Sequence, residues 1–238
     1  MFAARIIGHR GCAAHAPENT LAGLREAARR GVSWVEIDVC LLRDSTPVII
    51  HDAKVDRTTD GVGALADLDW AAVSHLDAGS WFATRFAGER VPRLDEALAE
   101  VQSLGLGLNL ELKTHGDEGE RLVDAILPYM RDSGIARDQI MVSSFDHPTL
   151  AIFHAAAPGF AVGVLYGEIA SNWRDVAEPL DAVAVIADYR KVAEGAIRDV
   201  VADGRDIYVY TPNDPARVYA QWRWGLDGVI SDDPERFR

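Results

Sequence analysis

Residues 34–41 read WVEIDVCL, and this stretch says most about the fold. Acidic and apolar residues alternate in it with the two-residue period of a β-strand. Glu36 and Asp38 therefore share one face of the strand, while the intervening valines and isoleucine share the other. A strand with acids on one face and branched apolar residues on the other suits a sheet that packs against helices and carries a polar site.

Comparable apolar runs recur along the chain, separated by polar loops and helical patterns. The main strands that we predict are Arg5–His9, Trp34–Leu41, Leu106–Leu112, Ile140–Ser144, Ala161–Tyr166, Ala182–Ile186, Ile207–Thr211 and Gly228–Ser231. Val48–Ile50 adds a short extra strand after the second one. Eight strands alternating with helices in 238 residues indicate an α/β fold, a (β/α)8 TIM barrel. A doubly wound sheet is the main rival, but no glycine-rich dinucleotide fingerprint follows the first strand.

Between the strands, apolar residues recur at helical spacing. The predicted helices follow Thr20 and end at Gly31, run from Leu94 to Val101 and from Leu122 to Met130, and include a last long helix begun by Asp214-Pro215. The segment 52–92 is too long for a plain connection, so we expect a small insertion after the second strand of one barrel domain, 1–238. Trp81 and Phe82 within it either pack the insertion onto the barrel or form a wall for substrate.

Charge and composition exclude several classes of protein. The chain has 24 basic and 37 acidic residues, a net charge of −13, which disfavours nucleic acid and anionic membranes as partners. No apolar run is long enough for a membrane span, and the first residues lack the apolar core of a secretory signal. Cys12 and Cys40 fit no metal motif and are expected to be small buried thiols. We expect a cytoplasmic monomer or homodimer without stable membrane insertion.

Polar residues gather where the predicted strands end, which is where a TIM barrel carries its active site. Glu111 and Lys113 share one face of the strand Leu106–Leu112, as Glu36 and Asp38 do on theirs. Three carboxylates that converge at a barrel mouth repel each other and need a cation or protons. Oxygen ligands of this kind suit a hard divalent ion, Mg²⁺ or Ca²⁺. Pairing of the acids with arginines in a structural network is the alternative.

Two histidines and two cations extend this pattern. His9 ends the first strand and His51 ends the short extra one, so together they offer a general acid and a general base. Lys113 offers a compact positive charge, and Arg10 a planar fork for phosphate oxygens. These residues around a metal would suit a phosphoryl centre. The residues therefore favour metal-assisted phosphoester chemistry.

Seven short motifs that run in order along the chain resemble the glycerophosphodiester phosphodiesterase family. They are His9-Arg10-Gly11, Pro17-Glu18-Asn19-Thr20, Glu36-Ile37-Asp38-Val39, His51-Asp52, Asp56-Arg57-Thr58-Thr59, Glu111-Leu112-Lys113 and Gly225-Leu226-Asp227-Gly228-Val229-Ile230-Ser231-Asp232. The segment from Gly79 to Glu96 is similar to the insertion of that family and its return to the barrel. The chain departs from the family at Tyr210, where tryptophan is usual, which leaves the preferred alcohol open.

The resemblance implies hydrolysis of glycerophosphodiesters, small-molecule substrates, to glycerol 3-phosphate and an alcohol. It implies Glu36, Asp38 and Glu111 as metal ligands, with the ion Mg²⁺ or Ca²⁺. His9 and His51 match the acid and base, in an order that the sequence leaves open, and Arg10 and Lys113 match phosphate-binding positions. In such enzymes a neighbouring hydroxyl of the substrate attacks phosphorus and gives a cyclic phosphate, which water opens.

Three alternatives remain at this point. The same chemistry on lysophospholipids would need an apolar groove in the insertion. A sugar-phosphate isomerase or aldolase barrel would use Lys113 as a Schiff-base amine. A catalytically silent ligand-sensing barrel is disfavoured because it needs neither both histidines nor all three carboxylates.

Overall fold

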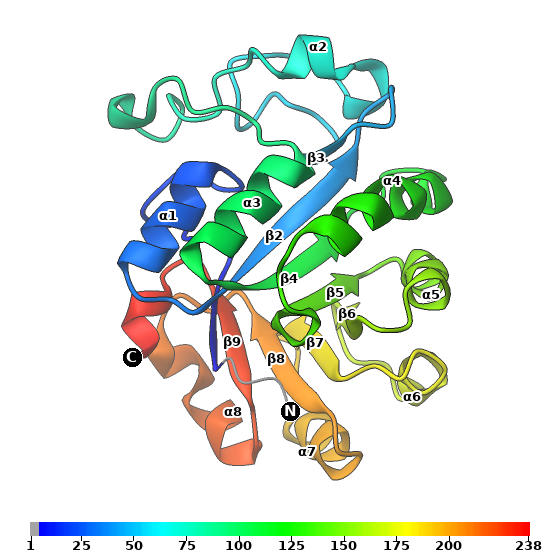
Figure 1. The fold of residues 1–238 in the computed structure, drawn as a ribbon. Helices are drawn as coiled ribbons and strands as arrows, with labels where there is room; N and C mark the ends of the chain where they lie inside the picture. Colours follow the sequence, from blue (N-terminus) through cyan, green and yellow to red (C-terminus); the bar gives the residue numbers. More distant parts are fainter. Residues whose placement is uncertain (1–4) are drawn as a thin grey trace.

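Eight parallel strands form a closed barrel with helices around its outside in a computed structural model, which describes residues 5–238 (Figure 1). The barrel strands are β1 (Ile6–Gly8), β2 (Trp34–Leu41), β4 (Gly107–Leu112), β5 (Ile140–Ser144), β6 (Ala161–Tyr166), β7 (Ala184–Asp188), β8 (Asp206–Tyr210) and β9 (Gly228–Ser231). Neighbouring strands pair in parallel around the ring, and β1 closes it by pairing with both β9 and β2. The predicted (β/α)8 TIM barrel is confirmed.

The short strand β3 (Pro47–Ile49) lies outside this ring. It pairs antiparallel with the far end of β2, so that Val39 lies opposite Ile49. Its carboxyl end returns to the barrel mouth and brings His51 beside the end of β2, where Ile50 N donates to Asp38 O over 3.1 Å. The extra strand therefore carries a histidine to a site that the barrel strands alone would not supply.

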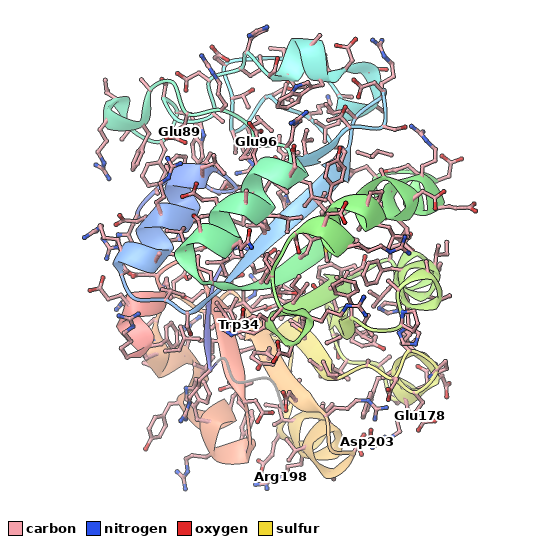
Figure 2. The ribbon with its side chains drawn as sticks, viewed as in Figure 1. Trp34, Glu89, Glu96, Glu178, Arg198 and Asp203 are labelled. Carbon is pink, nitrogen blue, oxygen red and sulfur yellow. The ribbon has the colours of Figure 1, made fainter. Side chains whose placement is uncertain are left out.

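Helices connect the strands and cover the barrel (Figure 1). They are α1 (Leu21–Arg29), α3 (Leu94–Leu104), α4 (Gly119–Asp132), α5 (His147–Ala156), α6 (Arg174–Ala177), α7 (Glu194–Ala202) and α8 (Tyr219–Trp224), with α2 (Trp70–Val73) in the insertion. Thr20 caps α1 by accepting a hydrogen bond from Gly23 N, so this helix begins directly after Thr20 as predicted. Charged side chains such as Glu178 and Arg198 lie around the outside of the barrel (Figure 2).

Two sequence predictions are wrong in detail. The strand predicted at Ala182–Ile186 is β7, Ala184–Asp188, because its ladder with β8 continues to a pair between Asp188 and Tyr210. The predicted long last helix is a 3₁₀ turn, Pro215–Val218, followed by the six-residue α8. Asp214 does cap the turn by accepting from Ala216 N, but the left-handed Gly225 ends α8 after two turns.

The interior has separate apolar layers. One fills the inside of the barrel and contains Ile7, Trp34, Met141, Leu165, Ala184, Ile186, Tyr208 and Ile230. A larger one lies between the strands and the helices. Gly107 is required inside the barrel, because a Cβ there would lie 2.2 Å from the Trp34 ring. Among the described residues, this apolar filling occupies the barrel interior below the mouth.

The segment between β3 and α3 forms a cover with an apolar core of its own (Figure 1). It contains two 3₁₀ turns, Leu65–Asp67 and Thr84–Phe86, on either side of α2. Val55, Leu65, Val73 and Val91 are buried in it and pack with Cys40 from β2. Within residues 5–238, no helix is long and apolar enough to span a bilayer.

Candidate functional site

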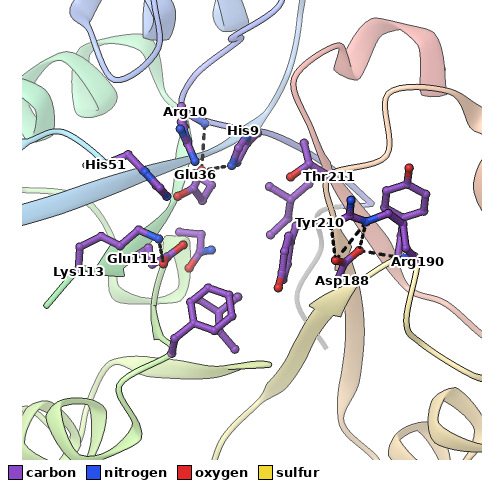
Figure 3. A pocket seen from close by; sticks show the side chains of 15 residues that line it. His9, Arg10, Glu36, His51, Glu111, Lys113, Asp188, Arg190, Tyr210 and Thr211 are labelled. Carbon is purple, nitrogen blue, oxygen red and sulfur yellow. Dashed lines mark hydrogen bonds and ion pairs between the residues drawn. The ribbon is translucent and has the colours of Figure 1, made fainter. Parts of the chain in front are cut away.

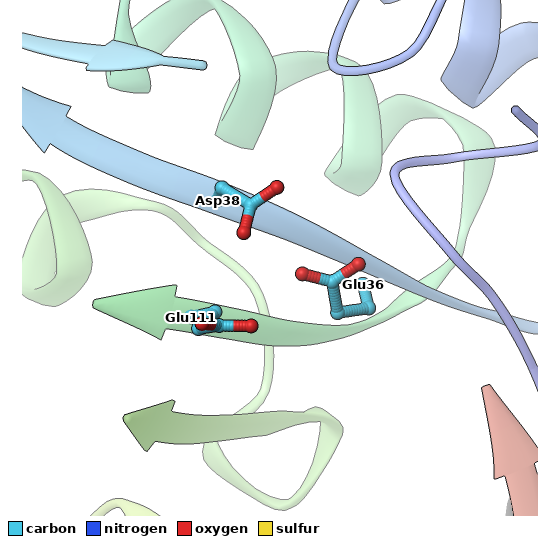
Figure 4. A group of neighbouring side chains, drawn as sticks. All are labelled: Glu36, Asp38 and Glu111. Atoms are coloured by element: carbon cyan, nitrogen blue, oxygen red, sulfur yellow. The ribbon is translucent and has the colours of Figure 1, made fainter. Parts of the chain in front are cut away.

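Three acids meet at the carboxyl ends of β2 and β4. In the register of these two strands, Asp38 lies beside Glu111, and Glu36 lies two pairs earlier, on the same face of β2 as Asp38. One carboxylate oxygen from each of the three lies within 4.8 Å of the other two, and all three side chains are buried (Figure 4). The structure thus brings together the acids that the alternation in the sequence placed on one face.

Burial and mutual repulsion strongly perturb this trio. Burial raises the pKa of Glu36 well above its usual value, and the charges of Asp38 and Glu111 raise it further. Burial and the Asp38 charge likewise raise the pKa of Glu111 to about 7, against the effect of Lys113. Burial opposes ionisation of Asp38 too, but Arg10 and Lys113 outweigh it and lower its pKa. The trio therefore has one strongly favoured carboxylate and two that need a further positive charge.

The donor set fits a hard divalent cation. Glu36 Oε1 and Asp38 Oδ1 are buried and accept no hydrogen bond, although Lys113 Nζ lies 3.6 Å from the latter. Burying an oxygen that accepts no hydrogen bond costs folding free energy. A bound cation would offset this cost. Carboxylate oxygens without nearby thiolates are the ligands that Mg²⁺ and Ca²⁺ prefer.

Arg10 and Lys113 flank the acids as cations. Arg10 has a positive φ of 50°, which turns its backbone amide toward Glu36 Oε2 at 2.9 Å. Its guanidinium lies 3.4 Å from Asp38 and 2.6 Å from Glu18. Lys113 Nζ lies 2.5 Å from Glu111 Oε1. Burial alone would lower the pKa of Lys113, but the charges of Glu111 and Asp38 raise it, so this amine stays protonated.

The two histidines are held in the same way. His9 Nδ1 lies 2.6 Å from Asp232 Oδ1, and His51 Nδ1 lies 2.6 Å from Asp52 Oδ1. A carboxylate at Nδ1 fixes the ring and leaves Nε2 for proton exchange. His9 Nε2 lies 3.9 Å from Glu36 Oε2, at the edge of the acid trio. Burial lowers the pKa of His51, and the charges of Arg10 and Lys113 act in the same direction.

Several residues that orient the site had no role assigned from sequence. The side-chain amide of Asn19 donates to Asp38 Oδ2 over 2.8 Å, and its Oδ1 accepts from Asp38 N. Its left-handed backbone, with φ of 55°, places it there. Asp52 and Asp232 follow His51 and the last strand directly, which is the signal that could have found them.

Arg57 of the insertion joins the two sides of the site. Its guanidinium donates to both oxygens of Glu18, at 2.7 and 2.8 Å, and to both oxygens of Asp52, at 2.6 and 3.1 Å. Glu18 in turn holds Arg10, and Asp52 holds His51. One residue of the insertion therefore fixes a cation and a histidine at once.

These groups line a cavity of about 440 Å³ at the barrel mouth (Figure 3). Six of the seven predicted site residues line it; Asp38 lies buried just behind. The opposite wall comes from β5 to β8 and the loops after them, and includes Phe145, Tyr210 and the pair Asp188–Arg190. Tyr210 meets Phe145 edge to face at 5.7 Å between ring centroids, and its hydroxyl donates to Tyr166 O.

Fold and site together define a (β/α)8 barrel whose mouth carries three clustered acids, two cations beside them and two histidines held by carboxylates. The model of the glycerophosphoryl diester phosphodiesterase family matches residues 9–236. The chain belongs to this family.

Three similar proteins match this chain over nearly its whole length. A glycerophosphodiester phosphodiesterase of Caldanaerobacter subterraneus is 31% identical over 97% of this chain and 94% of its own. The structure of an Oleispira antarctica phosphodiesterase in complex with the product sn-glycerol-3-phosphate is 35% identical, with a TM-score of 0.93 over 98% of this chain and 94% of that one. The Thermotoga maritima glycerophosphodiester phosphodiesterase is 26% identical with a TM-score of 0.78, over 98% and 96%.

Proposed function

We propose that this protein hydrolyses glycerophosphodiesters to sn-glycerol 3-phosphate and an alcohol with the help of a divalent ion, Mg²⁺ or Ca²⁺. One observation carries the proposal. Two buried carboxylate oxygens without a hydrogen bond, one of Glu36 in the wall of the cavity and one of Asp38 just behind it, lie close to Arg10 and Lys113. The family and the product complex of the Oleispira antarctica structure support the choice of substrate.

Each group has a place in this reaction. Glu36, Asp38 and Glu111 would hold the ion, which when bound would neutralise charge on the phosphate and polarise its bonds. Arg10 and Lys113 would bind the phosphate oxygens and stabilise the charge that shifts in the transition state.

Proton transfer would fall to the histidines. As the substrate's own hydroxyl attacks phosphorus, the Nε2 atom of one histidine takes its proton. The other histidine gives a proton to the alcohol oxygen as its bond to phosphorus breaks. Water then opens the cyclic phosphate with the two roles exchanged. Asp232 and Asp52 would keep His9 and His51 in the required tautomer and orientation.

The geometry argues against a Schiff-base barrel. An amine that attacks a carbonyl must be neutral. Lys113 lies against Glu111 and has a raised pKa, so it suits phosphate binding instead.

A substrate panel tests the proposal. We compare release of sn-glycerol 3-phosphate from glycerophosphocholine and glycerophosphoethanolamine with release of choline from lysophosphatidylcholine, each with Mg²⁺, Ca²⁺ or Mn²⁺. The two deacylated diesters are expected to give the highest kcat/KM. Absence of product with every ion and substrate would contradict it. The cytoplasmic location, the monomeric or dimeric state and the division into one domain with an insertion stay predictions.

A further inference from the structure

Asn109 of β4 is a buried amide without a partner in the wall of the cavity. The residue is 1% exposed and lines the cavity. Its Oδ1 atom accepts no hydrogen bond within residues 5–238, and its Nδ2 atom donates none there. Buried amides normally have partners, because leaving one unpaired costs free energy. This side chain therefore has an unused donor and an unused acceptor at the cavity.

Two other asparagines near the mouth show how an amide with a structural role is held. Asn19 is also buried, and both ends of its amide are bonded to Asp38. Asn213 donates to Asp232 Oδ2 through its Nδ2 atom, and its Oδ1 atom accepts from Asp232 N. Asn109 has no such bonds, so the neighbouring residues give no reason for an amide at this position.

Asn109 lies where the acid trio meets the apolar filling of the barrel. It is opposite Glu36 in the ladder with β2 and opposite Met141 in the ladder with β5. Met141 belongs to the apolar filling, as do Leu165 and Ile230, which line the same cavity. A ligand arm that extends from the acid trio toward this filling therefore meets an amide with both ends free.

The two free ends select the chemistry of the group that binds there. A metal ion takes only the amide oxygen and leaves Nδ2 unpaired, whereas a phosphate oxygen takes only the N–H groups and leaves Oδ1 unpaired. A hydroxyl group both donates and accepts, so it can use either end of the amide. A hydroxyl therefore suits this side chain better than an ion or a phosphate does.

We propose that Asn109 is a specificity-determining residue that binds the hydroxyl of the glycerol arm that does not attack phosphorus. The inference rests on the proposed function and adds to it the residue that recognises this arm. The arm with the attacking hydroxyl must lie in this cavity, because His9 and His51 both line it. The second hydroxyl is one carbon farther from phosphorus. Asn109 then distinguishes glycerol from a diol that lacks this hydroxyl.

Two substrates isolate the second hydroxyl. Glycerophosphocholine has it, and 2-hydroxypropyl phosphocholine has a hydrogen atom in its place. Both keep the attacking hydroxyl and the same leaving alcohol, so choline release measures both reactions. The native protein is expected to have a kcat/KM roughly 5- to 150-fold lower on the analogue, because that substrate leaves a buried amide unpaired.

Asn109→Leu keeps the approximate shape of the side chain and removes both ends of the amide. The variant is expected to lower kcat/KM for glycerophosphocholine by the same factor, roughly 5- to 150-fold, and to change that for the analogue by less than about threefold. The discrimination between the two substrates should therefore disappear. An equal loss on both substrates, or no loss on glycerophosphocholine, would overturn the inference.

Ser143→Ala is the matched control. Ser143 Oγ is also buried in the barrel wall without a hydrogen bond, but this residue does not line the cavity. The variant is expected to change both substrates by the same factor and to keep the discrimination. Loss of discrimination in Ser143→Ala as well would show that any change in this wall has that effect, and would overturn the inference.

Thermal unfolding separates binding from a structural role. Asn109→Leu replaces an unpaired buried amide by an apolar group, so its melting temperature should equal or exceed that of the native protein. A lower melting temperature together with an equal loss on both substrates would identify Asn109 as a structural residue and overturn the inference.

Binding measurements do not depend on turnover. Calorimetric titration with Mg²⁺ or Ca²⁺ should give native protein and Asn109→Leu the same Kd within about threefold. A Kd raised by roughly tenfold or more, with the discrimination intact, would make Asn109 a metal ligand and overturn the inference.

With the ion present, the native protein is expected to bind sn-glycerol 3-phosphate more tightly than propane-1,2-diol 1-phosphate, and Asn109→Leu to bind the two alike. The same preference in both proteins would overturn the inference. If the native protein hydrolyses no substrate, the proposed function fails. The comparison of the two phosphates still decides whether Asn109 binds the hydroxyl, so the two failures are distinct.

Discussion

The two halves of the barrel mouth carry acids in opposite states. On β2, Glu36 and Asp38 each keep a buried oxygen that accepts no hydrogen bond. On β7, Asp188 is also buried, but it accepts three hydrogen bonds from the side chain of Arg190 and one from the Arg190 backbone amide. An acid at the end of a barrel strand is therefore not by itself a metal ligand. Buried oxygens that accept no hydrogen bond distinguish the half where we propose a bound cation.

Replacing one acid in each half tests this difference, and the largest effect on the rate is expected here. Glu36→Gln is expected to lower kcat by on the order of 10³-fold at saturating metal, since metal-ion stabilisation is worth several kcal/mol. Asp188→Asn keeps its shape and is expected to cost less than about tenfold, because its partner is a side chain and not a cation from solution. Rates of glycerol 3-phosphate release at several metal concentrations measure both, and similar losses in the two variants would contradict the distinction.

His9 and His51 lie in the same half of the mouth as Glu36 and Asp38, which we call the charged half. Their loss is expected to have the next largest effect on the rate. His9→Ala and His51→Ala should each lower kcat by roughly 10²–10⁴-fold, as loss of a proton-transfer group does. His75→Ala, an exposed histidine of the insertion, is the matched control and should leave the rate unchanged. A rate within tenfold of native for either site variant would remove that histidine from the reaction.

Arg57 tests whether the insertion holds the charged half in position. Arg57→Met removes the link between Glu18 and Asp52 and is expected to lower kcat by roughly 10–100-fold, the usual effect of losing a residue that orients a site. Asp52, which holds His51, then loses its hydrogen bonds from Arg57. The pH profile of kcat should therefore shift as well. Arg43→Met breaks an exposed ion pair with Asp69 at the end of β2 and serves as control. Unchanged rate and pH profile in Arg57→Met would refute a positioning role.

The smallest expected effect is on stability without metal. The pKa of Glu111 is about 7 in the folded protein against a usual value of 4.5, so the folded state holds a proton that the unfolded state releases. Stability of the metal-free protein should therefore fall as pH rises from about 4.5 to 7. Each kcal/mol corresponds to about 2–4 °C in melting temperature for a chain of this size. Scanning calorimetry should show a metal-induced stabilisation that grows over this interval; one that shrinks would contradict the origin given for it.

The sequence predicts the barrel and the charged half well, because both follow from local periodicity. Alternation of polar and apolar residues puts Glu36 and Asp38 on one face of β2 and Glu111 on one face of β4. Parallel pairing of the two strands then brings these faces side by side. The residues that orient the site come together only when the barrel closes, through the pairing of β9 with β1. Asp232 reaches His9 across 223 residues of chain, which no local pattern encodes.

Strand ends and short helices are predicted less well for a related reason. β7 is apolar at nearly every position, so nothing in its sequence marks where it stops, and Asp188 was missed as a residue of the mouth. The end of that strand is set by its hydrogen-bond ladder with β8. Likewise, the left-handed Gly225 limits α8 to six residues, Tyr219–Trp224.

The most direct test of a metal-dependent phosphodiesterase built on the acid trio is one titration. The native protein, stripped with a chelator, is assayed for glycerol 3-phosphate release from glycerophosphocholine while Mg²⁺ or Ca²⁺ is added back. We predict no release from the stripped protein and saturable recovery with at least one ion. Full activity in the presence of the chelator would contradict the account.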